Sequence, residues 1–304
     1  MGLVLSTSWN ASRYTRGKGL VFEIKKLGFE EIELSFNLTA AMVDDIALLA
    51  RNGQIKVSSV HNFCPIPNGV RRQEALPDYF SLASTDECER KKAVALVKIS
   101  VDTALRLNAK AVVLHCGRVE VPDRTRDLIC LYARGQKDSS LFRRIRNEAI
   151  QQRRLKCRAF FQKALKSLEA LGRYAVARGI SLGIETRFYY REIPSFEEIG
   201  VILKKLRGGN MFYWHDTGHA QIMENLGYCR HKDYLRAYSQ RMLGIHLHGI
   251  IGCVDHQAPT KSDFDFRMLK GYLKPATIKV IEAHRSASHK EIKASGKFLK
   301  ALLG

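Results

Sequence analysis

Short apolar, β-branched segments alternate with longer helical patterns along the whole chain, and this alternation constrains the fold more than any other feature. Eight βα units in a row predict a closed parallel barrel ringed by helices, a (βα)8 barrel of the α/β class, rather than an open sheet. The predicted strands are Val4–Thr7, Glu31–Phe36, Lys56–Asn62, Ala111–Cys116, Ser181–Thr186, Met211–Asp216, Leu243–His248 and Thr277–Ala283. The helical patterns lie near residues 17–27, 40–51, 88–107, 140–178, 195–206, 219–240 and 288–302, and a short one covers Arg267–Tyr272.

Length and composition favour a single domain in a reducing compartment. The 304 residues are 45% hydrophobic and can bury a large core, and no Pro/Gly/Ser-rich linker divides them, so we predict one domain over residues 1–304. No apolar run approaches the ~20 residues that cross a bilayer, and the N-terminus lacks the layout of a signal peptide. The seven cysteines form no C-x-x-C pair and are odd in number, which indicates a reducing cytoplasm rather than a disulfide framework. No membrane partner is expected.

The net charge of +20 indicates anionic partners, because 50 Lys and Arg face only 30 Asp and Glu. Half of this excess lies between Arg134 and Arg178, where thirteen basic residues face three acidic ones within a predicted long helix. This segment is interpreted either as a solvated helix face or as a rim that collects phosphate-bearing ligands. The sequence lacks the interleaved aromatic and basic residues of a DNA-gripping surface, so nucleic acid is not the expected partner.

Polar residues gather at the C-terminal ends of the predicted strands, where a barrel of this kind places its catalytic groups. Eight of the ten histidines lie at or just after such an end. Side chains two residues apart on a strand point the same way, and the residues between them are apolar and suit the helix-facing side. Three pairs are therefore expected to point into the barrel near its mouth: Glu185 with Arg187, His246 with His248, and Glu282 with His284.

A divalent metal site would explain why these polar residues converge. Buried polar groups lose their hydration, which costs free energy unless hydrogen bonds or a bound cation replace the water. Imidazole and carboxylate together suit Zn, Mn or Fe, and we expect one to three ions per chain. A single histidine at a strand end is more often structural. Nine histidine and carboxylate residues at the same end of consecutive strands, in contrast, indicate a metal centre. The candidate ligands are His61, His115, Glu185, Asp216, His219, His246, Asp255, His256 and Glu282.

These motifs resemble those of the xylose isomerase-like TIM barrel superfamily (AP endonuclease family 2), which groups sugar isomerases and epimerases with endonuclease IV. The resemblance runs over nearly the whole chain, and its most specific part is Asp216-Thr217-Gly218-His219, which matches a D-T-x-H signature. The other matching segments are Gly28–Leu34, Val113–Gly117, Gly183–Glu185, Gly244–Leu247 and Ile281-Glu282. The resemblance implies a metal bound by Glu185, Asp216, His246 and Glu282.

Two branches of the superfamily imply different chemistry. Sugar isomerases and epimerases use one metal with those four ligands, and here Glu185 and Glu282 become the proton-transferring pair. Endonuclease-like phosphodiesterases hold up to three metals, which suit phosphodiester hydrolysis. Their additional ligands resemble His61, His115, His219, Asp255 and His256. The family pattern separates the last two by one residue, so only one of the adjacent Asp255 and His256 is expected to face inward from an extended segment.

The favoured hypothesis from the sequence is a metal-dependent phosphodiesterase acting on a phosphorylated small molecule, such as a cobamide. His61–Pro67 and Ile184–Arg187 are similar to segments of the cobamide-remodelling phosphodiesterases. Glu185, Glu282 and Arg187 are the expected catalytic residues, and Arg187, His248 and His284 the expected substrate-binding residues. Arg187 either holds a phosphate oxygen or orients the carboxylate ligands. The alternatives are a single-metal sugar or sugar-phosphate isomerase or epimerase, and a non-catalytic barrel that binds ligand or nucleic acid through its basic helix.

Overall fold

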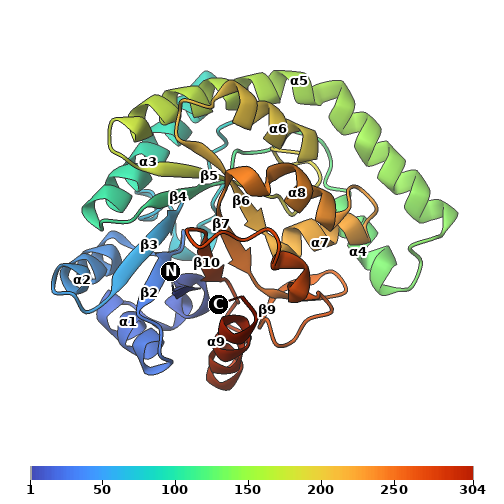
Figure 1. Ribbon diagram of the computed structural model, residues 1–304. Helices are drawn as coiled ribbons and strands as arrows, with labels where there is room; N and C mark the ends of the chain where they lie inside the picture. The colour runs from blue at the N-terminus through green and yellow to red at the C-terminus, as the bar shows by residue number, and fades with distance from the viewer. Residues whose placement is uncertain (1, 304) are drawn as a thin grey trace.

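A computed structural model describes residues 2–303 and contains a closed barrel of eight parallel strands in the order β1-β10-β7-β6-β5-β4-β3-β2 (Figure 1). This confirms the predicted (βα)8 TIM barrel. The barrel strands are β1 (Leu3–Ser6), β2 (Glu31–Leu34), β3 (Lys56–His61), β4 (Ala111–Leu114), β5 (Ser181–Glu185), β6 (Met211–Asp216), β7 (Met242–Leu247) and β10 (Ile278–Ile281). Most of them are shorter than predicted, because the residues after each strand already belong to the loops of the barrel mouth.

The helices surround the barrel on its outside (Figure 1). They are α1 (Gly17–Lys26), α2 (Ala40–Arg51), α3 (Glu87–Arg106), α4 (Thr125–Ala133), α5 (Ser140–Val176), α6 (Phe196–Lys205), α7 (Thr217–Asn225), α8 (His231–Tyr238) and α9 (His289–Leu303). Within residues 2–303, no helix combines the length and the apolar character required to cross a membrane.

The structure differs from the sequence prediction in three connections. The helical pattern near 219–240 is two helices, α7 and α8, because Gly227 takes a left-handed conformation (φ +76°) just after α7. Asp216 caps α7 by accepting a hydrogen bond from the His219 amide at 2.7 Å. The mouth loops also contain α4 and a two-stranded hairpin of β8 (Gly249–Ile251) and β9 (Val254–Gln257). Between the hairpin and β10, the helical structure of the described residues is limited to the 3-10 helix Phe266–Leu269, which is shorter than the predicted segment Arg267–Tyr272 suggests.

The lower half of the barrel interior is apolar and is centred on the fully buried Trp214. Two glycines make room for its ring. A Cβ atom would lie 2.2 Å from the ring if placed on Gly244, and 2.8 Å from it if placed on Gly183. The other buried side chains of this plug are Val4, Ala111, Val113, Ile278 and Val280. The residues between them point outward and join the larger core between the strands and the helices, as the strand alternation predicts.

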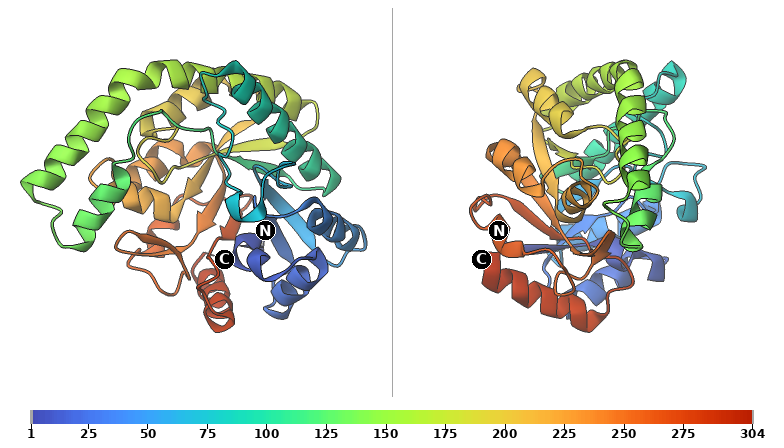
Figure 2. Two further views of the ribbon diagram at one scale, coloured as in Figure 1. Left: turned by 180° about the vertical axis from the view of Figure 1, so that it is seen from behind. Right: turned by 90° about the vertical axis from the view of Figure 1, so that its right-hand side faces the viewer.

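The basic segment forms α5, a helix of 37 residues that spans roughly 55 Å (Figure 2). Its first half extends away from the barrel beside α4. Most of its basic side chains are exposed, although Arg153 is buried and pairs with Glu198 at 2.7 Å. Exposure of this kind agrees with a solvated helix face. The collection of phosphate-bearing ligands stays a prediction.

Candidate metal centre

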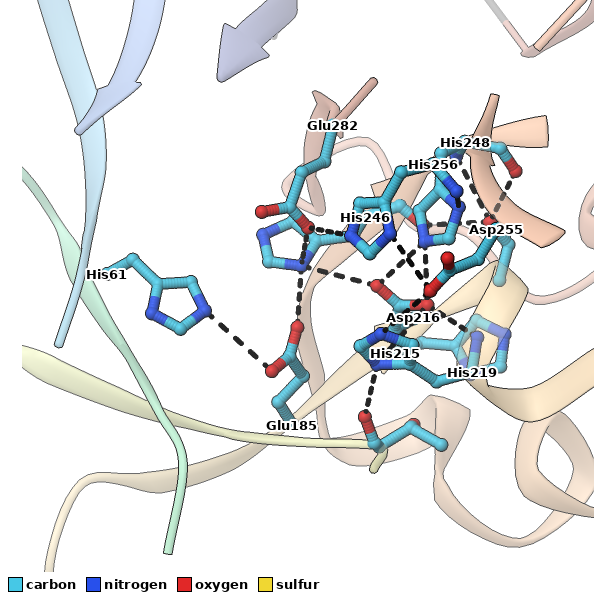
Figure 3. Close-up of polar contacts among 12 residues, drawn as sticks. His61, Glu185, His215, Asp216, His219, His246, His248, Asp255, His256 and Glu282 are labelled. Atoms are coloured by element: carbon cyan, nitrogen blue, oxygen red, sulfur yellow. Dashed lines mark hydrogen bonds and ion pairs between the residues drawn. The ribbon is translucent and has the colours of Figure 1, made fainter. Parts of the chain in front are cut away.

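Four side chains from the mouth ends of β5, β6, β7 and β10 meet above the tryptophan plug (Figure 3). Glu185, Asp216, His246 and Glu282 each bring one ligand atom, and these four atoms all lie within 4.8 Å of one another. All four residues are buried, with exposed fractions between 0 and 5%. The structure therefore brings together the four residues that the resemblance implied, on the inward face that strand alternation predicted.

His246 lies at the centre of this group with carboxylates on both sides of its ring. Its Nδ1 atom lies 2.7 Å from Glu185 Oε1 and 2.9 Å from Glu282 Oε2. Its Nε2 atom lies 3.1 Å from Glu33 Oε1, and Glu33 also accepts a hydrogen bond from the Ser59 hydroxyl at 2.7 Å. A carboxylate behind an imidazole fixes the orientation of the ring and raises its basicity.

Sequence reasoning did not include Glu33 among the site residues. Glu33 is fully buried and lies on β2, directly opposite the ligand-bearing strands. The available signal was its place near the end of a predicted strand, which it shares with every other residue of the centre. A lone carboxylate in that position does not stand out, because its role depends on His246, more than two hundred residues later in the chain.

The electrostatics of the group favour its charged forms. Burial alone raises the pKa of Glu282, but His246 and His256 outweigh burial and lower it to about 2. Burial likewise opposes ionisation of Glu185, yet the neighbouring histidines hold its pKa well below the usual value. Burial lowers the pKa of His246, whereas the carboxylates of Glu282 and Glu33 raise it well above the ordinary range. The group therefore concentrates three ionised carboxylates around one imidazole, that of His246.

A second group shares Glu185 with the first. The Glu185 Oε2 atom lies 2.7 Å from His115 Nε2 and 3.7 Å from His61 Nε2, whereas its Oε1 atom faces His246. His61 comes from the end of β3, and His115 follows β4 by one residue. Burial and the charge of Arg187 lower the pKa of His115 to about 3, so this imidazole is neutral at neutral pH. The two oxygens of one carboxylate thus face two separate sets of nitrogen donors.

Arg187 is buried, and its guanidinium forms ion pairs with two carboxylates. Its guanidinium donates to Glu185 Oε2 at 2.5 Å and to Glu192 Oε1 at 3.1 Å. These contacts agree with the expectation that Arg187 orients the carboxylate ligands, and its binding of phosphate stays a prediction. The sequence analysis also missed Glu192 and Asp78, which lie close to His115 and form a further cluster of ligand types with it. Both come from irregular loops, where no periodic pattern could single them out.

A third group is made by His219, His248 and His256 beside Asp255. The expectation that only one of Asp255 and His256 faces inward assumed an extended segment, and this premise does not hold at His256. His256 takes a left-handed conformation (φ +52°), so the segment is not extended there and both side chains reach the group. Asp255 Oδ2 lies 3.8 Å from His219 Nε2 and 2.9 Å from His256 Nδ1.

Of the two expected substrate-binding histidines, His248 belongs to this third group and His284 borders it. The rings of His248 and His256 stack with centroids 4.2 Å apart, and His284 stacks on His256 at 3.8 Å. His248 Nε2 also lies 2.9 Å from Asp216 Oδ1, so His248 is a candidate ligand as well as a candidate contact for substrate. His284 is exposed at the outer end of the stack, where it faces the solvent side of the mouth.

Comparisons with known proteins give a family and a fold. The sequence model of the xylose isomerase-like TIM barrel family (AP endonuclease family 2) matches residues 21–302. A D-tagatose 3-epimerase-like protein superposes with a TM-score of 0.68 at 17% identity, covering 100% of this chain and 97% of that one. The D-psicose 3-epimerase of Clostridium cellulolyticum H10 gives 0.67 at 14% identity, covering 100% and 99%.

A third similar structure is the 3-keto-D-glucoside 4-epimerase YcjR of E. coli. It superposes with a TM-score of 0.68 at 11% identity and covers 99% of both chains. No curated protein matches the chain. At these identities the structural likeness shows the fold alone.

Proposed function

The chain belongs to the xylose isomerase-like TIM barrel family, and on that premise we propose that it is a divalent-metal-dependent isomerase or epimerase of a sugar or sugar phosphate. The observation that carries the proposal is the convergence of Glu185, Asp216, His246 and Glu282 from four neighbouring strands. The names of the similar structures support this reaction class, because the three compared here are described as sugar epimerases or as epimerase-like. They support it better than the phosphodiesterase favoured by the sequence analysis.

The donor set fits a divalent cation. Three buried carboxylates surround one ring nitrogen of His246, and such a charge excess is costly in a protein interior unless a cation balances it. Carboxylate oxygens with one imidazole nitrogen suit Mn, Fe or Zn. Glu33 supplies the carboxylate that metal-binding histidines usually find behind their second nitrogen. When bound, the metal polarises neighbouring carbonyl and hydroxyl oxygens of the sugar.

Proton transfer falls to Glu185 and Glu282. The depressed pKa values of both carboxyls keep them ionised at neutral pH, so either can accept a proton from the carbon beside the sugar carbonyl. Epimerisation requires that one carboxylate removes this proton and that the other returns a proton to the opposite face of the same carbon. Arg187 holds Glu185 in place through Oε2 and leaves Oε1 on the side of His246.

Phosphoester hydrolysis is the second candidate, and one observation favours it. The two oxygens of Glu185 face separate donor groups, as expected for a carboxylate that bridges two metals, and a one-metal isomerase has no need for ligands at His61 and His115. The solvated and basic α5 is compatible with a phosphorylated substrate. No comparison concerns cobamides, so that substrate stays a prediction from the sequence.

Metal content and solvent isotope exchange together distinguish the two reactions. For the isomerase or epimerase we expect one equivalent of metal per chain, and transfer of deuterium from heavy water to the carbon beside the carbonyl in a panel of ketoses and their phosphates. For the hydrolase we expect two or three equivalents and release of nitrophenol from bis(p-nitrophenyl) phosphate. Hydrolysis without isotope exchange contradicts the proposal.

A double variant sharpens this test. His61→Ala with His115→Ala removes the second donor group but keeps all four residues of the first. The epimerase proposal predicts that this variant retains its one equivalent of metal and measurable isotope exchange. The hydrolase proposal predicts the loss of one equivalent and of phosphodiester cleavage. The matched control is His289→Ala, which removes an exposed imidazole paired with Glu23 outside the barrel.

A further inference from the structure

A chain of buried polar side chains runs behind the barrel wall, on the helix-facing side of β5 and β6. The Thr186 hydroxyl lies 2.7 Å from the Tyr213 hydroxyl, which lies 2.6 Å from His215 Nδ1. His215 Nε2 lies 2.9 Å from His231 Nε2, and His231 Nδ1 lies 3.0 Å from Gln221 Oε1. None of these side chains belongs to the candidate metal groups, although Tyr213, His215 and His231 are all at most 1% exposed.

The last residues of this hydrogen-bonded series, Asn225 and Gly252, fix the direction of all its hydrogen bonds. The carbonyl oxygen of Gly252 can only accept, so Asn225 must turn its amide nitrogen toward it, at 2.6 Å. Asn225 Oδ1 then accepts from Gln221 Nε2 at 2.9 Å. Gln221 must therefore present its oxygen to His231, which requires a proton on His231 Nδ1.

The tautomers of both histidines follow from this anchor. Neutral His231 with a proton on Nδ1 can only accept at Nε2, so His215 must carry its proton on Nε2. His215 Nδ1 then accepts from the Tyr213 hydroxyl, and the Tyr213 oxygen accepts from the Thr186 hydroxyl. Burial lowers the pKa of His215 to about 3 and that of His231 well below its ordinary value, which agrees with two neutral rings. All six donors point in one direction, from Thr186 toward Gly252.

The first residue of this series, Thr186, lies beside the candidate metal centre. Thr186 lies between Glu185 and Arg187, and its carbonyl oxygen accepts a hydrogen bond from His219 Nδ1 at 2.9 Å. This contact places the proton of His219 on Nδ1. The His219 Nε2 atom, 3.8 Å from Asp255 Oδ2, then keeps a lone pair that can bind a metal. Asp216 directly follows His215 in β6. The series of hydrogen bonds thus includes the sequence neighbours of Glu185 in β5 and of Asp216 in β6 and connects the two strand ends.

We propose that Tyr213, His215 and His231 are positioning residues that hold the ends of β5 and β6 and thereby the orientation of Glu185, Asp216 and His219. Apolar side chains of similar size would fill the same layer without desolvating polar groups, whereas a fully satisfied polar chain admits one arrangement only. The catalytic part of this inference rests on the proposed function. The assignment of tautomers does not.

The first test is 15N NMR of the metal-free protein with labelled histidine, because protonated and unprotonated ring nitrogens differ strongly in 15N shift. We expect a proton on His215 Nε2 and on His231 Nδ1, and none on His215 Nδ1 or His231 Nε2. The opposite tautomers, or a charged ring at neutral pH, overturn the proposal. This measurement needs neither substrate nor metal, so it stands apart from the test of the proposed function.

The second test replaces Tyr213 by Phe, which removes one hydroxyl and leaves the ring in place. His215 Nδ1 and the Thr186 hydroxyl then lose their partner, so we expect altered 15N shifts for His215, His231 and also His219. We expect kcat to fall by about tenfold with little change in KM, since the variant misplaces groups that act on bound substrate. Unchanged 15N shifts and unchanged kcat contradict the positioning role.

The matched control is Tyr174→Phe, which removes a hydroxyl that is also hydrogen-bonded, to Asp102 at 2.7 Å, but at the surface. It should leave the 15N shifts and kcat unchanged. His231→Gln offers a second variant should Tyr213→Phe fail to fold. The amide can accept from His215 with its oxygen but cannot reproduce the imidazole reach to Gln221, so the shift of His215 should stay near its wild-type value while kcat falls.

Discussion

The upper and lower halves of the barrel interior are built by the same strands but from opposite kinds of side chain. Below, Trp214 and aliphatic residues form a dry plug, and above it carboxylates and imidazoles converge. The two layers touch where the rings of Trp214 and His246 lie 5.2 Å apart. Each step of two residues along a strand crosses from one layer to the other: Trp214 to Asp216, Gly244 to His246, and Val280 to Glu282.

The apolar lower layer stabilises the barrel, whereas the polar upper layer carries the candidate metal ligands. The plug contributes apolar contacts that fix the spacing of the strands, which requires no charge and no ligand. The upper layer places like charges side by side, and His246 and Arg187 are among the groups that offset their repulsion. Substitutions in the upper layer should therefore change chemistry and metal binding, and substitutions in the lower layer should change the stability of the fold.

The largest effect should come from Glu185→Gln in the upper layer. The amide keeps the shape of the side chain but removes the charge that His115, His246 and Arg187 share. We expect metal binding to be lost and kcat to fall by about a thousandfold or more, with circular dichroism unchanged. Glu31→Gln, at the opposite end of the barrel, is the control and should keep full activity. Full activity in Glu185→Gln would contradict the assignment of Glu185 as a metal ligand and catalytic residue.

Next in size is Gly244→Ala in the lower layer. The added methyl group would lie 2.2 Å from the ring of Trp214, which is fully buried among the other side chains of the plug. We expect a loss of about 3 kcal/mol in the free energy of unfolding, measured by urea denaturation. Gly208→Ala is the control, since no atom lies within 4 Å of the added Cβ. Equal stability of the two variants contradicts the tight fit around the ring.

A smaller effect is expected from Glu33→Gln, which tests whether the carboxylate behind His246 belongs to the centre. The amide can still contact the imidazole but no longer raises its basicity. Metal affinity, measured by competition with a chelator, should fall by about ten- to a hundredfold. Wild-type affinity in this variant would show that the Glu33 carboxylate is dispensable for metal binding.

The last effect is confined to acid conditions and concerns the stability of the metal-free protein below pH 4.5. The pKa of Glu282 is lowered to about 2 in the folded chain, so its ionised form stabilises the fold above its unfolded pKa of 4.5. That stabilisation is lost as pH falls from 4.5 toward 2, by up to about 1.4 kcal/mol per pH unit for one proton. Glu282→Gln should flatten this decline in urea titrations, whereas Gly244→Ala should leave its slope unchanged. A steeper decline in Glu282→Gln contradicts the prediction.

The barrel and most of its mouth were predictable because both depend on repetition. Eight strands in succession carry the same signal, and inward-facing pairs such as His246 and His248 follow from strand alternation. The sequence analysis favoured hydrolysis from the number of candidate ligands, which indicates how many groups meet but not which reaction they support. Its expectations of one domain and a cytoplasmic location stay predictions.

The remaining features depend on single backbone angles and on distant partners. The left-handed conformation of His256 brings two adjacent side chains to one group, and no periodic pattern encodes it. Gly227 divides a continuous helical pattern into two helices. His215 stands at a strand end like the candidate ligands, yet it faces outward to His231, whose place in the fold is set by the packing of α8.

The fit of Trp214 between Gly183 and Gly244 also limits the order in which this sequence can diverge. Since a side chain on either glycine destabilises the barrel while the indole is present, a first step at Trp214 is the one that makes room for the others. In a library randomised at the three positions, alanine or larger residues at 183 or 244 should survive only together with a smaller side chain at 214. These three sites, spread over sixty residues of the chain, are therefore inherited as a unit.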